Sequence, residues 1–153
     1  MAEIKKQVSD FNQIIKYLRG AKRKIDIATK ILKISEDAAF QMAYEAMIKA
    51  SIGLMLSYGI RPRIGPGYHK TVIKFAGKIL GKKFKSLIKT FDHMRQKRNR
   101  FIYEVDTIIS EKEAEDSIKI ANKYLAIIEE IVQKNNPQKK TNLRHTCASN
   151  TRF

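Results

Sequence analysis

Arg98 is the residue whose type and position most clearly indicate chemistry. It follows Phe91 by seven positions and therefore falls on the apolar stripe of a predicted helix, whose members recur at three- and four-residue spacing: Phe84, Leu87, Ile88, Phe91, Met94, Phe101 and Ile102. Removing an unpaired guanidinium from water is costly. Arg98 therefore needs a carboxylate, a group of carbonyls, or a cleft that admits water or an anion.

Two interpretations of Arg98 and its neighbour Asn99 remain open at this point. In the first, the two side chains cross-link helices through Glu45 or Glu104 and have a structural role only. In the second, they line a cleft that binds a negatively charged ligand.

Two histidines are further candidates for a site. His93 lies about one and a half helical turns before Arg98, which places it near Arg98 but not on the same face. His69 begins another predicted helix, where it is placed to cap the helix or to contact an anion. We expect no metal, because the potential metal ligands are scattered along the sequence: His69, His93, His145 and Cys147. We also expect no cofactor, because no phosphate-binding glycine loop occurs.

The charge of the chain is strongly positive and unevenly distributed. Its formal net charge is +16 in 153 residues. Residues 61–100 hold thirteen Lys or Arg and one acid, Asp92, whereas residues 101–133 hold eight acids and three lysines. Such a basic region attracts polyanions, so nucleic acid is the leading class of partner and an acidic membrane surface the second. Alternatively, the lysine-rich composition reflects genome bias and solubility alone.

The basic side chains that we predict to contact phosphates come from one loop and two helices. Lys70, Lys74 and Lys78 form a line at four-residue spacing on a short amphipathic helix. The full set of candidates outside Arg98 and Asn99 is Arg61, Arg63, His69, Lys70, Lys74, Lys78, Lys82, Lys83 and Arg100.

The elements that would position these residues all follow a helical period. We expect helices over residues 3–33, 35–58, 69–80, 83–103 and 110–134. Ser35 and the Ser110–Glu113 capping box mark two of the starts. No alternating strand pattern is present, and residues 59–67 form a Gly/Pro-rich loop. The second helix is apolar nearly all round, interrupted by one polar line that faces solvent or a cleft near Arg98: Gln41, Glu45 and Lys49.

The expected fold is therefore all-α, an up-and-down bundle of four to five helices. The bundle occupies residues 1–134 as one domain, and residues 135–153 are expected to form a disordered basic tail. One cysteine, in that tail, indicates a reducing, cytoplasmic setting. No signal peptide and no membrane-spanning window is seen, so we expect no membrane association through a span.

The chain resembles the HEPN family, the "higher eukaryotes and prokaryotes nucleotide-binding" helical domains, over residues 10–134. The resemblance is carried by an alanine- and aromatic-rich second helix, Phe40–Met47, that ends at Gly59; by the Gly67-Tyr68-His69-Lys70 start of the third helix; and by Arg98-Asn99-Arg100-Phe101-Ile102-Tyr103. It implies a HEPN-like bundle that binds RNA or a nucleotide and forms a homodimer. It also implies a nucleotidyltransferase or an antitoxin as a protein partner, in a toxin–antitoxin or defence system.

The chain departs from the family pattern at one position. Active members pair the arginine with a histidine in a metal-independent ribonuclease site at the dimer cleft, and here Tyr103 stands at the histidine position. A tyrosine does not titrate near neutral pH, and loss of a positioned acid or base lowers a rate by about 10²–10⁴-fold. We therefore expect binding without efficient catalysis, with Arg98 holding phosphate, Asn99 orienting it and Tyr103 stacking on a base or donating a hydrogen bond.

The geometry of one helix does not bring Arg98 and Tyr103 together. Five residues at about 100° each leave their side chains about 140° apart, so a symmetric second copy would have to close the gap. Two alternative functions stay open. One is a metal-independent endoribonuclease in which His93 or His69 replaces the missing base, and the other is a protein-interaction module whose charge is incidental.

Overall fold

The computed structural model describes residues 3–8 and 10–135 and confirms the all-α prediction. Its helices are α1 (Phe11–Ile31), α2 (Glu36–Ser57), α3 (Tyr68–Leu80), α4 (Lys85–Tyr103) and α5 (Glu111–Asn135), and a 3-10 turn, Lys82–Phe84, precedes α4. The predicted tail from residue 136 onward lies outside the described residues.

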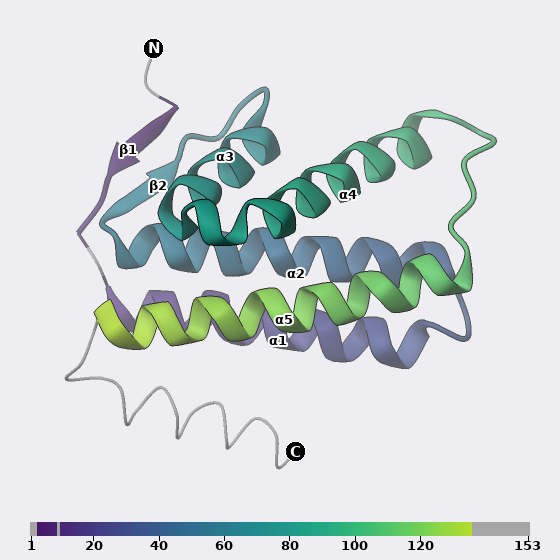
Figure 1. Ribbon diagram of the computed structural model, residues 1–153, viewed down its shortest axis with the longest axis horizontal. Coiled ribbons are helices and arrows are strands. Elements are labelled where there is room, and N and C mark those ends of the chain that lie inside the picture. Colours follow the sequence, from purple (N-terminus) through teal and green to yellow (C-terminus); the bar gives the residue numbers. More distant parts are fainter. Residues whose placement is uncertain (1–2, 9, 136–153) are drawn as a thin grey trace.

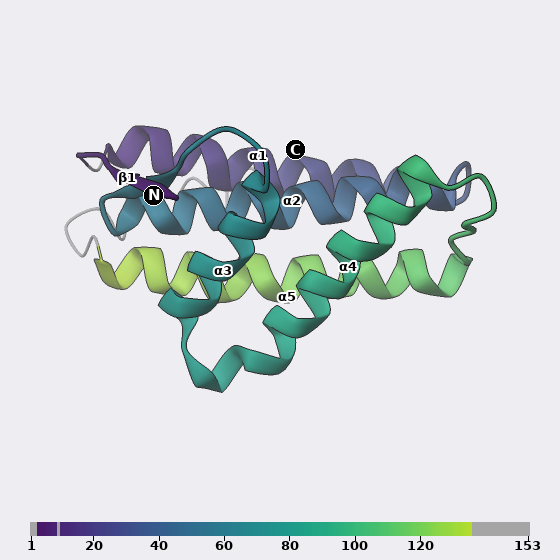
Figure 2. The ribbon, with the colours of Figure 1, turned by 90° about the horizontal axis from the view of Figure 1, so that it is seen from above.

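Helix α2 is the centre of the fold. It packs against α1, α5 and α3, and α3 and α4 cross it on the side opposite α1 (Figures 1 and 2). Its buried side chains lie on all sides, as the sequence predicts for a central helix. Ser35 caps its start, where the hydroxyl accepts a hydrogen bond from the Ala38 amide at 3.1 Å.

The predicted absence of strands is wrong. Strand β1 (Ile4–Lys6) pairs antiparallel with β2 (Ile60–Pro62), with Lys5 opposite Arg61. The helix expected over residues 3–33 therefore begins only at Phe11, where the Asp10 carboxylate caps it. Three-residue strands are too short to show alternation, and Ile4 happens to continue the helical spacing of α1.

Glu3 fastens the amino-terminal strand to α3. Its carboxylate accepts hydrogen bonds from Lys74 Nζ at 2.6 Å and from Thr71 Oγ1 at 3.2 Å. Its backbone carbonyl accepts from the Arg63 amide at 3.0 Å. The strand, the loop before α3 and the first turns of α3 are thus held together by backbone and side-chain bonds.

The polar line of α2 faces α1. Glu45 forms an ion pair with Lys24 at 3.8 Å, and the Lys49 ammonium lies 5.7 Å from the ring centroid of Tyr17. The sequence left two interpretations of this line, a strip facing solvent and a cleft wall near Arg98. Neither describes it fully, because Glu45 and Lys49 contact the neighbouring helix α1.

The carboxyl-terminal half contains a confirmed capping box. Ser110 Oγ accepts a hydrogen bond from the Glu113 amide at 3.0 Å, and Glu113 Oε1 accepts from the Ser110 amide at 3.2 Å. This pair fixes the start of α5 after the loop that follows α4. Between α2, α4 and α5, the rings of Tyr44, Phe91 and Tyr124 meet edge to face in the core.

Candidate functional site

A small basic cavity lies between the first turn of α3 and the middle of α4. We call it the α3–α4 pocket; it has a volume of about 310 Å³ and is lined by Gly67, Tyr68, His69, Lys70, Arg95, Arg98 and Asn99. The packing of two helices thus brings together the predicted residues His69, Lys70, Arg98 and Asn99. Among the described residues, no carboxylate lines it.

Arg98 is half-buried in this pocket and lacks an acidic partner among the described residues. Its Nε atom is buried and has no hydrogen-bond partner within residues 3–8 and 10–135. The two acids considered above are engaged elsewhere, Glu45 with Lys24 and Glu104 with the Thr107 hydroxyl. The guanidinium lies near the face of Tyr44, with its Cζ 5.8 Å from the ring centroid. Arg98 therefore places in the pocket a charge that no acid among the described residues neutralises.

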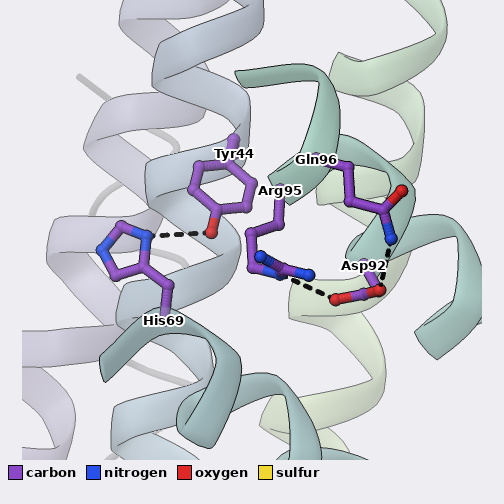
Figure 3. Close-up of polar contacts among 5 residues, drawn as sticks. All are labelled: Tyr44, His69, Asp92, Arg95 and Gln96. Atoms are coloured by element: carbon purple, nitrogen blue, oxygen red, sulfur yellow. Dashed lines mark hydrogen bonds and ion pairs between the residues drawn. The ribbon is translucent and has the colours of Figure 1, made fainter. Parts of the chain in front are cut away.

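Arg95 lines the same pocket but is already partnered. Its Nε donates to Asp92 Oδ1 at 2.8 Å, and Gln96 Nε2 donates to the other carboxylate oxygen of Asp92 at 2.9 Å (Figure 3). The hydrogen bond from Arg95 is the main cause that lowers the pKa of Asp92. Arg95 is therefore held in place while its planar group remains at the pocket wall.

His69 is tied to the core beneath the pocket. Its Nδ1 and the hydroxyl oxygen of Tyr44 are 2.9 Å apart (Figure 3). Burial lowers the pKa of His69, the positive charges of Arg98 and Arg95 act in the same direction, and the charge of Glu45 opposes them. Burial also raises the pKa of the Tyr44 phenol. Both groups are consequently neutral at neutral pH.

The backbone contributes to the electrostatics of the pocket. Gly67 precedes α3 with φ of 76° and provides no side-chain cap, and no acidic residue lies in the first turn of the helix. The amides of that turn carry partial positive charge. Together with Lys70, Arg95 and Arg98 they make the pocket a region that favours a negative group.

Several predicted site residues lie elsewhere. His93 and Arg100 line a second cavity, between α4 and α5, which we call the α4–α5 pocket. Tyr103 lines neither pocket: its side chain, at the end of α4, is 83% exposed. Within one chain, then, Tyr103 does not meet Arg98, in agreement with the angle of about 140° expected from helical geometry.

The other basic candidates do not line the α3–α4 pocket. Lys74 is neutralised by Glu3, and Arg61 Nη1 donates to Gln7 Oε1 at 3.1 Å to stabilise the strand pair. The remaining ones are exposed: Arg63, Lys78, Lys82 and Lys83.

Sequence reasoning missed three residues of the site. Arg95 lies three positions before Arg98, a spacing that places both on one helical face. Tyr44 carries a hydroxyl on a helix that is apolar nearly all round, and a buried hydroxyl requires a hydrogen-bond partner. Both signals were present in the sequence. Tyr68 lines the pocket because α3 begins there, one residue earlier than expected.

Two kinds of feature are not found within residues 3–8 and 10–135. No helix in this part of the chain has the length and apolarity needed to cross a membrane. No three His, Cys, Asp or Glu side chains in it gather as a metal ion would require.

Comparisons with known proteins agree with the resemblance seen in the sequence. Searches of curated proteins and of solved structures find no match. The family model described as "HEPN domain" matches residues 14–131, a span that runs from the first turn of α1 to the last turns of α5 and includes the whole α3–α4 pocket. The chain therefore belongs to the HEPN domain family.

Proposed function

We propose that this HEPN domain binds RNA or a nucleotide by taking a phosphate group into the α3–α4 pocket. The observation that carries the proposal is the buried Nε of Arg98, which has no partner among the described residues in a pocket without a carboxylate. Arginine recognises phosphate through parallel N–H donors, and Asn99 adds an amide beside it. The aromatic ring of Tyr68 provides a surface on which a base stacks.

The exposed end of α4 supports a homodimer in this proposal. Ile102 and Tyr103 at the end of α4 are 44% and 83% exposed, and Val105 and Ile108 in the loop that follows are 99% and 79% exposed. A second copy that covered them would bury apolar surface and bring its Tyr103 toward the first copy. A nucleotidyltransferase or an antitoxin is the partner class that family membership suggests.

The proposed binding proceeds without efficient RNA cleavage. Tyr103 and His93 both lie away from Arg98, and only His69 among the described histidines shares the pocket with it. That shared pocket is the observation that favours the second candidate, a metal-independent endoribonuclease with His69 as the base.

The test compares two arginines on one helix. Gel shifts with a panel of single-stranded RNAs should show that Arg98→Ala loses about 10–100-fold in affinity, since a hydrogen-bonded charge contributes roughly 1.5–3 kcal/mol. The matched variant Arg100→Ala, on the α4–α5 side, should change affinity less than about threefold. Equal losses would contradict the pocket as the site.

Two further measurements separate the candidate functions. Affinity should fall steeply as salt rises, because phosphate contacts release counterions. Binding that does not change with salt would instead favour a protein-interaction module. RNA cleavage in EDTA by the wild type, lost in both Arg98→Ala and His69→Gln, would establish the endoribonuclease and overturn binding without catalysis.

A further inference from the structure

We propose that Tyr44 is a positioning residue for the α3–α4 pocket: its hydroxyl holds His69 in the tautomer with the proton on Nε2, and its ring supports the Arg98 guanidinium. This inference rests on the proposed function for its effect on ligand binding. The tautomer itself does not depend on that function.

The hydroxyl of Tyr44 has one proton and, among the described residues, one hydrogen-bond partner. Tyr44 is fully buried, and its oxygen lies 2.9 Å from His69 Nδ1. A neutral imidazole has one nitrogen that donates and one that accepts. If the phenol oxygen instead accepted from Nδ1–H, its own buried proton would have no acceptor among the described residues, so we assign the phenol as the donor and the His69 proton to Nε2.

The ring of Tyr44 acts on the other side of the pocket. Phe91 meets it edge to face, with centroids 5.8 Å apart and an interplanar angle of 67°. The Cζ atom of Arg98 lies 5.8 Å from the centroid of the same ring. One rigid side chain on α2 therefore contacts His69 on α3 and Arg98 on α4, and fixes how far apart these two groups are held.

This arrangement decides what His69 does at neutral pH. With Nδ1 occupied and Nε2 protonated, the imidazole has no free lone pair with which to accept a proton from a ribose hydroxyl. It offers an N–H donor instead, which suits a phosphate oxygen. His69 is thus a binding group in the pocket rather than a general base, which argues against the endoribonuclease.

The first experiment observes the imidazole directly, without a ligand. The ¹⁵N shifts of the histidine rings, assigned with His69→Gln, should show Nε2–H for His69 in the wild type. Tyr44→Phe keeps the ring and removes the hydroxyl, so the two tautomers of His69 should mix. A wild type with the proton on Nδ1 would overturn the proposal, and so would a Tyr44→Phe spectrum identical to that of the wild type.

The control is a second buried tyrosine. Tyr124 on α5 is also fully buried, and its hydroxyl bonds to the Ser51 hydroxyl at 2.5 Å, away from His69 and Arg98. Tyr124→Phe also removes a buried hydroxyl and its hydrogen bond, yet should leave the His69 shifts unchanged. If it alters them as much as Tyr44→Phe does, the effect is general loosening of the core and the positioning role is wrong.

The second experiment measures binding of a short single-stranded RNA. Tyr44→Phe should weaken it about fivefold, the size expected for one misplaced hydrogen bond, and Tyr124→Phe should not. If the wild type binds no RNA, the proposed function fails while the tautomer result stands on its own. If the wild type binds and Tyr44→Phe binds equally well, the positioning role is overturned. Should Tyr44→Phe fail to fold, the wild-type ¹⁵N spectrum alone still decides the tautomer.

Discussion

Helix α4 separates two pockets that differ in how their charges are satisfied. On the side of α3, Arg98 faces a cavity of about 310 Å³ that no carboxylate of the described part of the chain lines. On the side of α5, Lys97 and Arg100 face a cavity of about 510 Å³ that also contains Glu113 and Asp116, and Lys97 pairs with Glu113 at 3.0 Å. The larger cavity therefore contains acids of its own, one of which pairs with Lys97.

The smaller pocket is the proposed ligand site because of its charge balance and not its size, since no acid of the described residues lines it. Ion pairs and the capping box on the α5 side hold α4 and α5 together. On the α3 side the buried Nε of Arg98 gains no such partner among the described residues, and its desolvation is a cost that a bound anion would offset.

The largest expected effect comes from replacing Arg98, on the α3 side, with methionine and comparing it with the same change at Lys97, on the α5 side. Methionine keeps a long unbranched side chain and removes the charge. Arg98→Met should lower RNA affinity about 10–100-fold and raise the free energy of unfolding by roughly 1 kcal/mol, because an unpartnered buried donor disappears. Lys97→Met should leave affinity within about twofold. Filter binding and urea denaturation measure the two quantities, and a destabilised Arg98→Met would show that the guanidinium supports the fold.

The next effect is a pH dependence confined to the α3 side. The groups facing His69 are Tyr44 and Glu45 on α2 and Arg95 and Arg98 on α4, and burial, the first cause, lowers the pKa of His69 from 6.5.

A bound phosphate favours the imidazolium and raises that pKa, so affinity should increase as the pH falls from 7 and level off below the pKa of the free protein. A rise of one pKa unit on binding gives about tenfold. Measured from pH 8 to pH 5, the affinity of His69→Gln should not depend on pH, whereas His93→Gln should show the same pH dependence as the wild type. A pH dependence retained by His69→Gln would remove His69 from the site.

A smaller effect distinguishes lysines on α3. Lys70 lines the pocket, whereas Lys74 is paired with Glu3. Lys70→Gln should lower affinity about threefold and make the salt dependence less steep by roughly one counterion. Lys74→Gln should change the salt dependence less. If both variants behave alike, the phosphate contacts extend evenly along α3.

The smallest effect tests the α5 side. Glu113→Gln removes the ion pair with Lys97 but keeps a side-chain oxygen that accepts the capping bond from the Ser110 amide, so the free energy of unfolding should fall by about 0.5 kcal/mol at neutral pH with RNA affinity unchanged. Lys97 is the main cause that lowers the pKa of Glu113. The contribution of the ionised Glu113 to stability is therefore present above the pKa of Glu113 in the unfolded state and is lost as the pH falls through its pKa in the folded state. Thermal melts at pH 7 and pH 3 would show this convergence of wild type and variant.

The sequence predicted most of the helices and the central residue of the pocket for physical reasons. Local signals survive in the fold, such as the Ser35 cap and the Ser110–Glu113 box. Arg98 was identifiable because a charge on an apolar stripe contradicts helical burial. Within the described residues the predicted stripe is only partly buried: Phe91 and Met94 are in the core, and Ile102 is exposed.

The rest of the site depends on how the helices pack, which spacing does not specify. The approach of α3 to α4 puts His69 beside Arg98 and leaves His93 on the opposite side of α4. Lys74 was predicted as a free cation because Glu3, its partner, lies 71 positions away in the sequence. Contacts within the chain between residues far apart in sequence also form β1, which is why the local pattern predicts a helix there.

The β1–β2 strand pair connects the first described residues to the proposed ligand site, which lies far from them in sequence. Glu3 holds Thr71, Lys74 and the Arg63 backbone, so the loop that leads into Gly67 and Tyr68 is anchored by residues at the beginning of the chain. Proteolytic trimming of the first six residues would release that loop and free Lys74 at the same time. Limited digestion from this end should therefore alter the proposed nucleic-acid binding while α1, α2 and α5 stay folded.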